Sequence, residues 1–188
     1  MLKQVATIKK PFKKEALVLP GKIARREKSI NEQLTKEFRR FIKNTELENQ
    51  YLTHYSDLTL SDFLSNKLLI VFIIRKGIPY SIFTLIQDLT PFSLNDWAAY
   101  LNISSKSLTR YRQSDKPFKP IHTEKIIEIA EVSNLGSEVF GDNDKFKLWL
   151  ETPNFALGNQ RPLELLKDSY GKEMVIGELT RIEHGILV

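Results

Sequence analysis

Residues 93–112 read SLNDWAAYLNISSKSLTRYR and hold two short helical patterns separated by a turn. Ser93 and Ser104 are of the residue types that cap helix N-termini, and each stands directly before one of the two patterns. Asn102-Ile103 would form the turn, and Ala98 is small where the two helices would cross. Their shared core would consist of Trp97, Leu101, Ile103 and Leu108. This spacing is that of a helix-turn-helix, and it predicts a helical fold.

The second helix of this motif would expose polar and basic side chains near its N-terminus. That end enters the major groove of DNA in proteins that bind with this motif. The candidate DNA-binding residues are Ser104, Ser105, Lys106, Ser107, Thr109, Arg110, Arg112, Lys116 and Lys119. The lysines and arginines can neutralise phosphates, while serine, threonine and arginine can also reach base edges. The alternative is a helical hairpin with a solvated basic face, since two short helices joined by a turn are common.

Helical periodicity continues on both sides of the motif. One face of a helix that begins near Ile30 carries Leu34, Phe38, Phe41 and Ile42. Ser61 or Asp62 can cap a second helix, which Gly77 ends. Further helices are expected from Ser81, over 94–101, from Ser104 and from about Thr123, and over 145–150, 162–166 and 173–184, with Gly171 as the break before the last. The pattern predicts an all-α protein.

The composition excludes several classes of protein. The chain has 188 residues, no cysteine and a net charge of +5, so disulfides and thiolate metal sites are excluded. Its longest apolar run, 68–74, is too short to span a bilayer. The N-terminus lacks the apolar segment of a signal peptide. These features predict a soluble, cytoplasmic protein.

The charge is distributed unevenly along the chain. Residues 1–50 carry 13 Lys and Arg against 6 Asp and Glu, whereas residues 134–188 carry 6 against 9. A basic N-terminal part is suited to binding a polyanion, and an acidic C-terminal part is suited to a different partner. Residues 1–28 lack sustained periodicity and are interpreted as a loose arm. The expected division is a basic N-terminal extension of arm plus helix over 1–60, a helix-turn-helix domain over 61–133 and a C-terminal module over 134–188.

Two strings in the C-terminal module are distinctive in length and order. Residues 149–166 read WLETPNFALGNQRPLELL, and residues 181–185 read RIEHG. They resemble the strings W-L-x-x-P-N-x-A-L-G-x-x-x-P-L-x-L-L and R-I-E-H-G of the MbcA/ParS/Xre family of antitoxins. The helix-turn-helix resembles the Xre-like domain that precedes the toxin-binding module in this family. The resemblance covers roughly residues 80–188.

The resemblance implies an antitoxin of a type II toxin–antitoxin system. Its C-terminal module would bind a cognate toxin encoded in the same operon, most commonly a RES-domain toxin that targets NAD, and would occlude the toxin's active site. The helix-turn-helix would bind operator DNA and repress the operon. A homodimer is expected, because one helix-turn-helix reads only a half-site. A hetero-oligomer with the toxin is expected as well.

The candidate toxin-binding residues follow from the resemblance and from the loop at 153–161, whose polar residues and glycine suit turns and outward presentation and in which Leu157 and Arg161 are the expected contact residues. They are Asn154, Leu157, Gly158, Arg161, Leu163, Arg181, Glu183, His184, Leu187 and Val188. Phe155 departs from the family, in which small or proline-like residues are frequent at this position.

An enzymatic role has little support in the residues. His184 has no partner nucleophile or second histidine at ligand spacing, and His54 and His122 are isolated. No metal cluster or nucleotide-binding fingerprint is visible, so no catalytic residue, metal or cofactor is expected. The alternative to an antitoxin is a stand-alone helix-turn-helix transcription regulator whose C-terminal module dimerises.

Overall fold

The computed structural model describes residues 20–43, 59–114 and 116–186. Within these ranges the chain forms ten α-helices and one 3-10 turn: α1 Pro20–Lys43, α3 Leu60–Ser65, α4 Lys67–Lys76, α5 Tyr80–Leu89, α6 Leu94–Tyr100, α7 Ser105–Gln113, α8 Pro120–Phe140, α9 Asn143–Glu151, η2 Phe155–Leu157, α10 Pro162–Leu165 and α11 Ser169–Glu183. The described residues contain no strand, only an isolated bridge between Asn154 and Gln160. The all-α prediction is confirmed.

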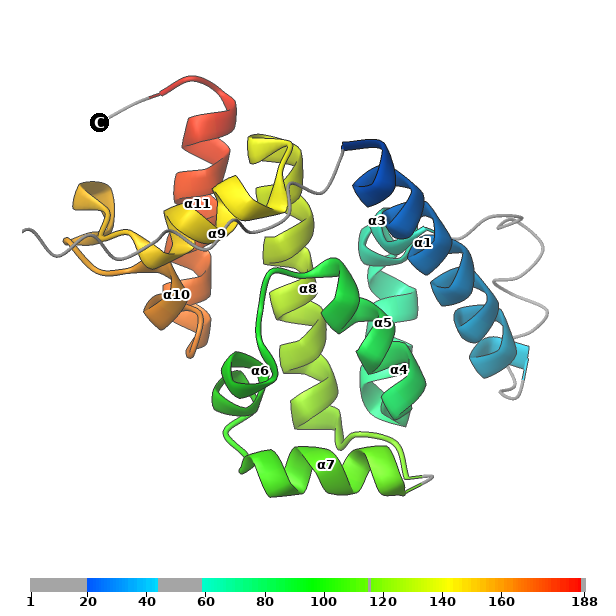
Figure 1. The fold of residues 1–188 in the computed structure, drawn as a ribbon. Coiled ribbons are helices and arrows are strands. Elements are labelled where there is room, and N and C mark those ends of the chain that lie inside the picture. Colours follow the sequence, from blue (N-terminus) through cyan, green and yellow to red (C-terminus); the bar gives the residue numbers. More distant parts are fainter. Residues whose placement is uncertain (1–19, 44–58, 115, 187–188) are drawn as a thin grey trace, which may run out of the picture.

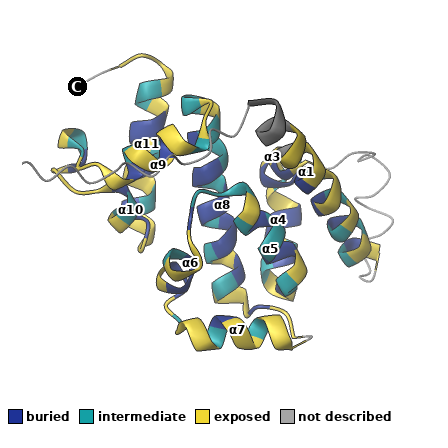
Figure 2. Cartoon of the chain, in the orientation of Figure 1, coloured by how far each residue is buried: buried dark blue, intermediate teal, exposed yellow. Residues whose placement is uncertain are grey.

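Helix α8 is the centre of the molecule (Figure 1). Helices α3 and α4 pack on one side of it, and α9 and α11 pack on the other. Ile126, Ile127, Ile129 and Ala130 lie on different sides of α8 and are all buried. A helix enclosed by neighbours needs such apolar surface all round. Figure 2 shows the buried positions of the surrounding helices gathered toward α8, whereas α7, across its N-terminal end, is mostly exposed.

Aromatic rings connect the helix-turn-helix to α5 and to the segments directly before and after the motif. Trp97 of α6 is fully buried and meets Phe83 of α5 edge-on, with 5.2 Å between ring centroids. Phe83 also packs against Phe118, at 5.1 Å. Phe92 and Tyr100 complete the set, each edge-on to Trp97. The position of α6 is therefore fixed by its ring contacts with α5 and with the segment that precedes α6.

Helix α1 begins ten residues earlier than the sequence periodicity predicted, at Pro20 rather than near Ile30. The prediction of a loose arm is thus wrong for residues 20–28, while residues 1–19 lie outside the described ranges. Leu34 and Phe38 are fully buried, and the Phe38 ring lies 4.4 Å from that of Phe63 in α3. The N-terminal extension therefore supplies part of the core of the helices that follow it.

Several other helix boundaries differ from the prediction. The helix expected from Ser61 or Asp62 is split at Asn66, and Thr59 caps its first part by accepting a hydrogen bond from the Asp62 backbone N–H at 3.1 Å. The Thr59 hydroxyl and backbone N–H donate to the Asp62 carboxylate, which lowers the pKa of Asp62. These reciprocal bonds form a capping box, which outcompetes a start at Ser61.

Two later helices also begin closer to the N-terminus than the sequence predicts. Helix α5 begins at Tyr80 rather than Ser81, and α8 begins at Pro120 rather than Thr123. The predicted break at Gly171 is wrong, because Asp168 caps α11 and Gly171 lies in its first turn.

Helix α8 runs through the expected domain boundary at 133–134, so the division of the chain stays a prediction. None of the helices in the described ranges has the length and apolar character to cross a bilayer.

Candidate functional site

Helix α7 presents most of the candidate DNA-binding residues on one open surface. Ser104 caps the helix by accepting a hydrogen bond from the Ser107 backbone N–H at 3.1 Å. Leu108 is the buried residue that holds α7 onto the core. The exposed candidates are Ser104, Ser105, Lys106, Thr109, Arg110, Arg112, Lys116 and Lys119, and Ser107 is half-buried. The structure gathers these side chains near one helix, and their contact with DNA stays a prediction.

The turn between α6 and α7 has the tight geometry that the motif requires. Asn102 adopts a left-handed backbone with φ of 50°, which asparagine tolerates better than most residues. The backbone N–H of Ile103 donates to the carbonyl of Ala98 at 3.0 Å. Ala98 is 4% exposed, as expected for a small residue at a close helix crossing. Ser93 and Asp96 form a capping box at the start of α6.

The loop after α7 is held by Phe118, which places lysines on both sides of a buried anchor. Phe118 is 1% exposed and stacks on Tyr111 with 4.1 Å between ring centroids. Its backbone N–H donates to the carbonyl of Ile78 at 2.8 Å. Burial, and then the positive charge of Lys119, lower the pKa of His122 beside this loop. His122 is therefore neutral near pH 7 and adds no charge to this basic surface.

The loop that carries the string ALG is closed on itself by main-chain and side-chain hydrogen bonds. The backbone N–H of Asn154 donates to the Gln160 carbonyl at 3.0 Å, and the N–H of Asn159 donates back to the Asn154 carbonyl at 2.9 Å. The Asn154 side chain accepts from the Ala156 N–H at 2.8 Å. Gly158 and Asn159 adopt left-handed backbones that close the turn. The loop is thus a rigid element rather than an open connection.

The side chain of Leu157, one of the expected contact residues, lies inside the domain. It is 2% exposed and belongs to the core, and its contact with a toxin stays a prediction. The turn η2 packs on α11, and Leu157 lies on its inner side because α11 supplies an apolar surface there. Gly158 and Arg161 are exposed as expected, whereas Asn154 and Leu163 are half-buried.

The C-terminal end of α11 carries the remaining described candidates. Glu183 and His184 are exposed, and Arg181 is half-buried. Arg181 contacts the carboxylate of Glu178, a buried residue that sequence reasoning missed. The sequence does contain the signal for this pair, because Glu178 stands three positions before Arg181, the spacing of an ion pair on a helix. Leu187 and Val188 lie outside the described residues.

A tyrosine hydroxyl joins the helix-turn-helix to the C-terminal module. Tyr100, at the end of α6, donates a hydrogen bond to the carbonyl of Leu163 in α10 at 3.4 Å. Burial, and then the negative charge of Asp96, raise the pKa of Tyr100, so the hydroxyl keeps its proton. The helix that packs against α7 therefore also contacts the segment directly after the closed loop.

Replacing Tyr100 with Phe is expected to lower the free energy of unfolding by about 0.5–1.5 kcal/mol, the net value of one hydrogen bond. The ring packing against Phe92 would persist. Urea denaturation followed by circular dichroism measures this change. Tyr170→Phe is the control, because that side chain is 83% exposed and should lose nothing. Equal stability of the two variants would show that the bond to Leu163 contributes nothing.

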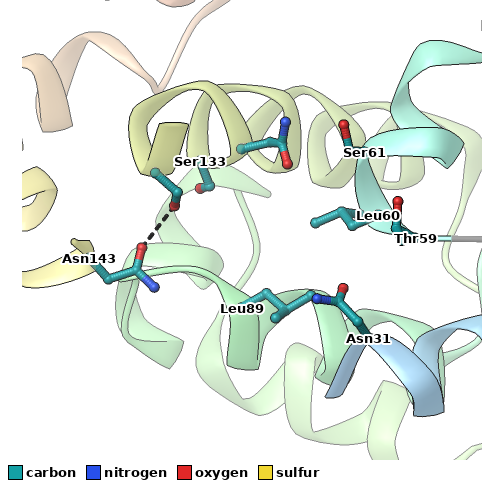
Figure 3. Close-up of a pocket in the computed structure, with 9 residues that line it drawn as sticks. Asn31, Thr59, Leu60, Ser61, Leu89, Ser133 and Asn143 are labelled. Atoms are coloured by element: carbon teal, nitrogen blue, oxygen red, sulfur yellow. Dashed lines mark hydrogen bonds between the residues drawn. The ribbon is translucent and has the colours of Figure 1, made fainter. Parts of the chain in front are cut away.

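The described residues also line a pocket of about 190 Å³ where α1, α3, α5, α8 and the start of α9 approach one another (Figure 3). Its lining is uncharged: Asn31, Thr59, Leu60, Ser61, Leu89, Ser133, Asn134, Ser137 and Asn143. Ser137 donates to the Asn143 side chain at 2.9 Å, the bond dashed in Figure 3. Ser133 donates to the Ile129 carbonyl at 3.0 Å. These polar groups serve the packing of the helices. In the described ranges, no group of three or more His, Asp or Glu side chains could hold a metal ion.

Comparison with known protein families assigns both halves of this arrangement. Residues 70–131 match the model of the antitoxin Xre-like helix-turn-helix domain. Residues 135–185 match the model of the antitoxin Xre/MbcA/ParS C-terminal toxin-binding domain. The two matches follow one another in the order that the sequence motifs predicted.

Two curated relatives agree with these matches. A protein named antitoxin Xre from Yersinia enterocolitica is 36% identical over 85 residues, which cover 45% of this chain and 57% of the relative. A protein of the same name from Photorhabdus laumondii is 28% identical over 116 residues, which cover 61% of this chain and 78% of the relative. The chain thus spans little more than half of the first relative's length. The chain thus carries an antitoxin Xre-like helix-turn-helix domain followed by an antitoxin Xre/MbcA/ParS C-terminal toxin-binding domain.

Proposed function

We propose that this protein is an antitoxin that binds and neutralises a cognate toxin through its C-terminal module and binds DNA through its helix-turn-helix. The observation that carries the proposal is the match of residues 135–185 to a toxin-binding domain, directly after a helix-turn-helix. The rigid loop at 154–160 and the exposed end of α11 support it, because both offer ordered surface to a partner at little entropic cost.

The proposed toxin is a RES-domain protein that acts on NAD, and the proposed mechanism is occlusion of its active site. This part rests on the resemblance to the family. The proposed contact residues on the described surface are Asn154, Gly158, Arg161, Leu163, Arg181, Glu183 and His184. Steric occlusion needs no catalytic group on the antitoxin, and none is assigned.

The end of α11 is organised for hydrogen bonding to such a partner. The buried carboxylate of Glu178 holds one side of the Arg181 guanidinium, whose side chain is 42% exposed. A guanidinium has five N–H donors, so others remain for a partner. Nδ1 of His184 lies 2.8 Å from the Thr180 carbonyl oxygen and donates to it, which leaves Nε2 outside this bond. Both side chains are thus oriented before binding.

On the DNA side, the proposed role is repression of the protein's own operon by a homodimer. The exposed cations of α7 and of the loop after it support DNA binding. A single helix-turn-helix reads one half-site, so a second copy would supply the other.

Arg110→Ala is expected to weaken DNA binding and to reduce the slope of log K against log salt by about 1 if Arg110 contacts a phosphate. The measurement is a titration of labelled promoter DNA at several salt concentrations. Lys147→Ala removes the same charge from an exposed position in the C-terminal module and serves as the control. Equal binding by both variants would remove Arg110 from the interface.

The antitoxin function itself is tested by co-expression with the adjacent open reading frame. The expected result is that the neighbour alone arrests growth, and that this chain binds its product and restores growth. A harmless neighbour that does not bind would overturn the proposal. The chain would then be a stand-alone transcription regulator, and its C-terminal module a dimerisation unit.

A further inference from the structure

Phe155 is the most exposed phenylalanine among the described residues. It is 76% exposed and belongs to η2, within the part of the chain that matches a toxin-binding domain. Water-exposed aromatic surface is unfavourable, and aromatic side chains, including phenylalanine, are enriched at the buried cores of protein interfaces. Its position two residues before buried Leu157 shows that the turn directs these two side chains to opposite environments.

The backbone under Phe155 is held on both sides. The Phe155 carbonyl accepts from the Gly158 N–H at 3.0 Å, and the Leu157 N–H donates to the Asn154 carbonyl at 3.1 Å. Leu157 anchors the inner side of the turn in the core. A phenylalanine has only two side-chain torsions, so a rigid turn presents it with little conformational entropy left to lose on binding.

The surroundings of Phe155 have the composition of an interface rim. Gly158, Asn159, Gln160 and Arg161 follow it in the loop, and all four are exposed. An aromatic centre with polar and charged neighbours is the usual anatomy of a protein–protein contact. Arg161, one of the proposed toxin contacts, follows Gln160, whose carbonyl accepts from the backbone N–H of Asn154 directly before Phe155.

We propose that Phe155 is the apolar anchor of the toxin interface and inserts into an apolar pocket on the toxin, where it selects the cognate partner. This inference rests on the proposed antitoxin function and adds to it the chemistry of the partner surface. A toxin without such a pocket would have to bury Phe155 against polar groups, which lowers affinity. Phe155 acts by filling the pocket, so its size and apolar character both matter.

The test compares Phe155→Ala, Phe155→Leu and Phe155→Asp in the full chain. The probe is the purified product of the adjacent open reading frame, with Kd measured by titration calorimetry. Phe155→Ala should raise Kd about 30-fold or more, the threshold of an interface hot spot. Phe155→Leu should retain most of the affinity, and Phe155→Asp should lose more than Phe155→Ala. Because Phe155 is exposed, all three variants should keep the wild-type Tm.

Tyr170→Ala is the matched control, since Tyr170 is 83% exposed in the same domain but lies on α11, outside the loop. If the wild-type chain binds and Phe155→Ala binds equally well, the anchor is refuted while the antitoxin function stands. The same holds if Tyr170→Ala loses as much affinity as Phe155→Ala. If the wild-type chain itself does not bind, both the proposed function and the anchor fail.

Discussion

Trp97→Ala should lower the free energy of unfolding by about 3–5 kcal/mol, the range for truncation of a large buried aromatic side chain. The Trp97 ring is fully buried and lies between Phe83, Phe92 and Tyr100. Alanine would leave a cavity that the three neighbouring rings, two on α5 and α6 and one in the segment between them, cannot fill without moving. Because native proteins are stable by only about 5–15 kcal/mol, this loss is a large share of the total. Urea denaturation followed by circular dichroism gives the value.

Two variants keep this result interpretable. Leu94→Ala changes the same helix at a position that is 38% exposed, and it should cost much less. Trp97→Phe should also cost less than Trp97→Ala. Among the described residues the buried Trp97 Nε1–H has no acceptor, so phenylalanine removes an unfavourable group together with part of the ring. A Trp97→Ala protein as stable as Leu94→Ala would contradict the role of this ring in the core.

Gly171→Ala is expected to destabilise the C-terminal module by about 1–3 kcal/mol or more, the cost of forcing an atom into a packed site. A Cβ on Gly171 would lie 2.0 Å from the Leu165 carbonyl oxygen and 2.8 Å from its carbonyl carbon. These are backbone atoms of α10, so relief requires α10 and α11 to separate. Since α10 follows the closed loop directly, toxin binding should weaken as well. Thermal unfolding and toxin titration measure the two effects.

The control for Gly171 lies on the same helix. Gly177 is exposed, and a Cβ there would meet no atom within 4 Å. Gly177→Ala should therefore leave the fold intact and raise stability by about 0.5–1 kcal/mol, because alanine favours helix over glycine. If both variants are equally stable, the close approach of α11 to Leu165 does not constrain this module.

Much of the fold follows from local sequence signals. Ser93 and Ser104 were expected to cap helices, and each accepts a backbone hydrogen bond at its helix start. Gly77 was expected to end a helix, and it caps the C-terminus of α4 with a positive φ. Such signals act between residues two to four positions apart, so a sequence window contains every participant. The helix-turn-helix and its exposed basic side chains could be predicted for this reason.

The N-terminal extension and Gly171 show where such windows fail. Residues 20–28 lack the apolar periodicity of a helix, yet they form the first turns of α1. The later turns of this helix pack on α3 and α5. Glycine often breaks a helix, but Gly171 lies within α11. Because it has no Cβ, α11 can approach the backbone of Leu165 closely. In both cases the deciding contact comes from an element outside the local window.

The sequence by itself determined the helical class, the helix-turn-helix and the two strings that indicate the family. Only the tertiary structure decided which side chains of the loop at 154–160 face outward. Leu157, an expected contact residue, is buried, whereas Phe155 is exposed. A short turn has no periodicity from which inside and outside can be read. Its orientation is set by α11, which lies more than ten residues further along the chain and covers one side of η2.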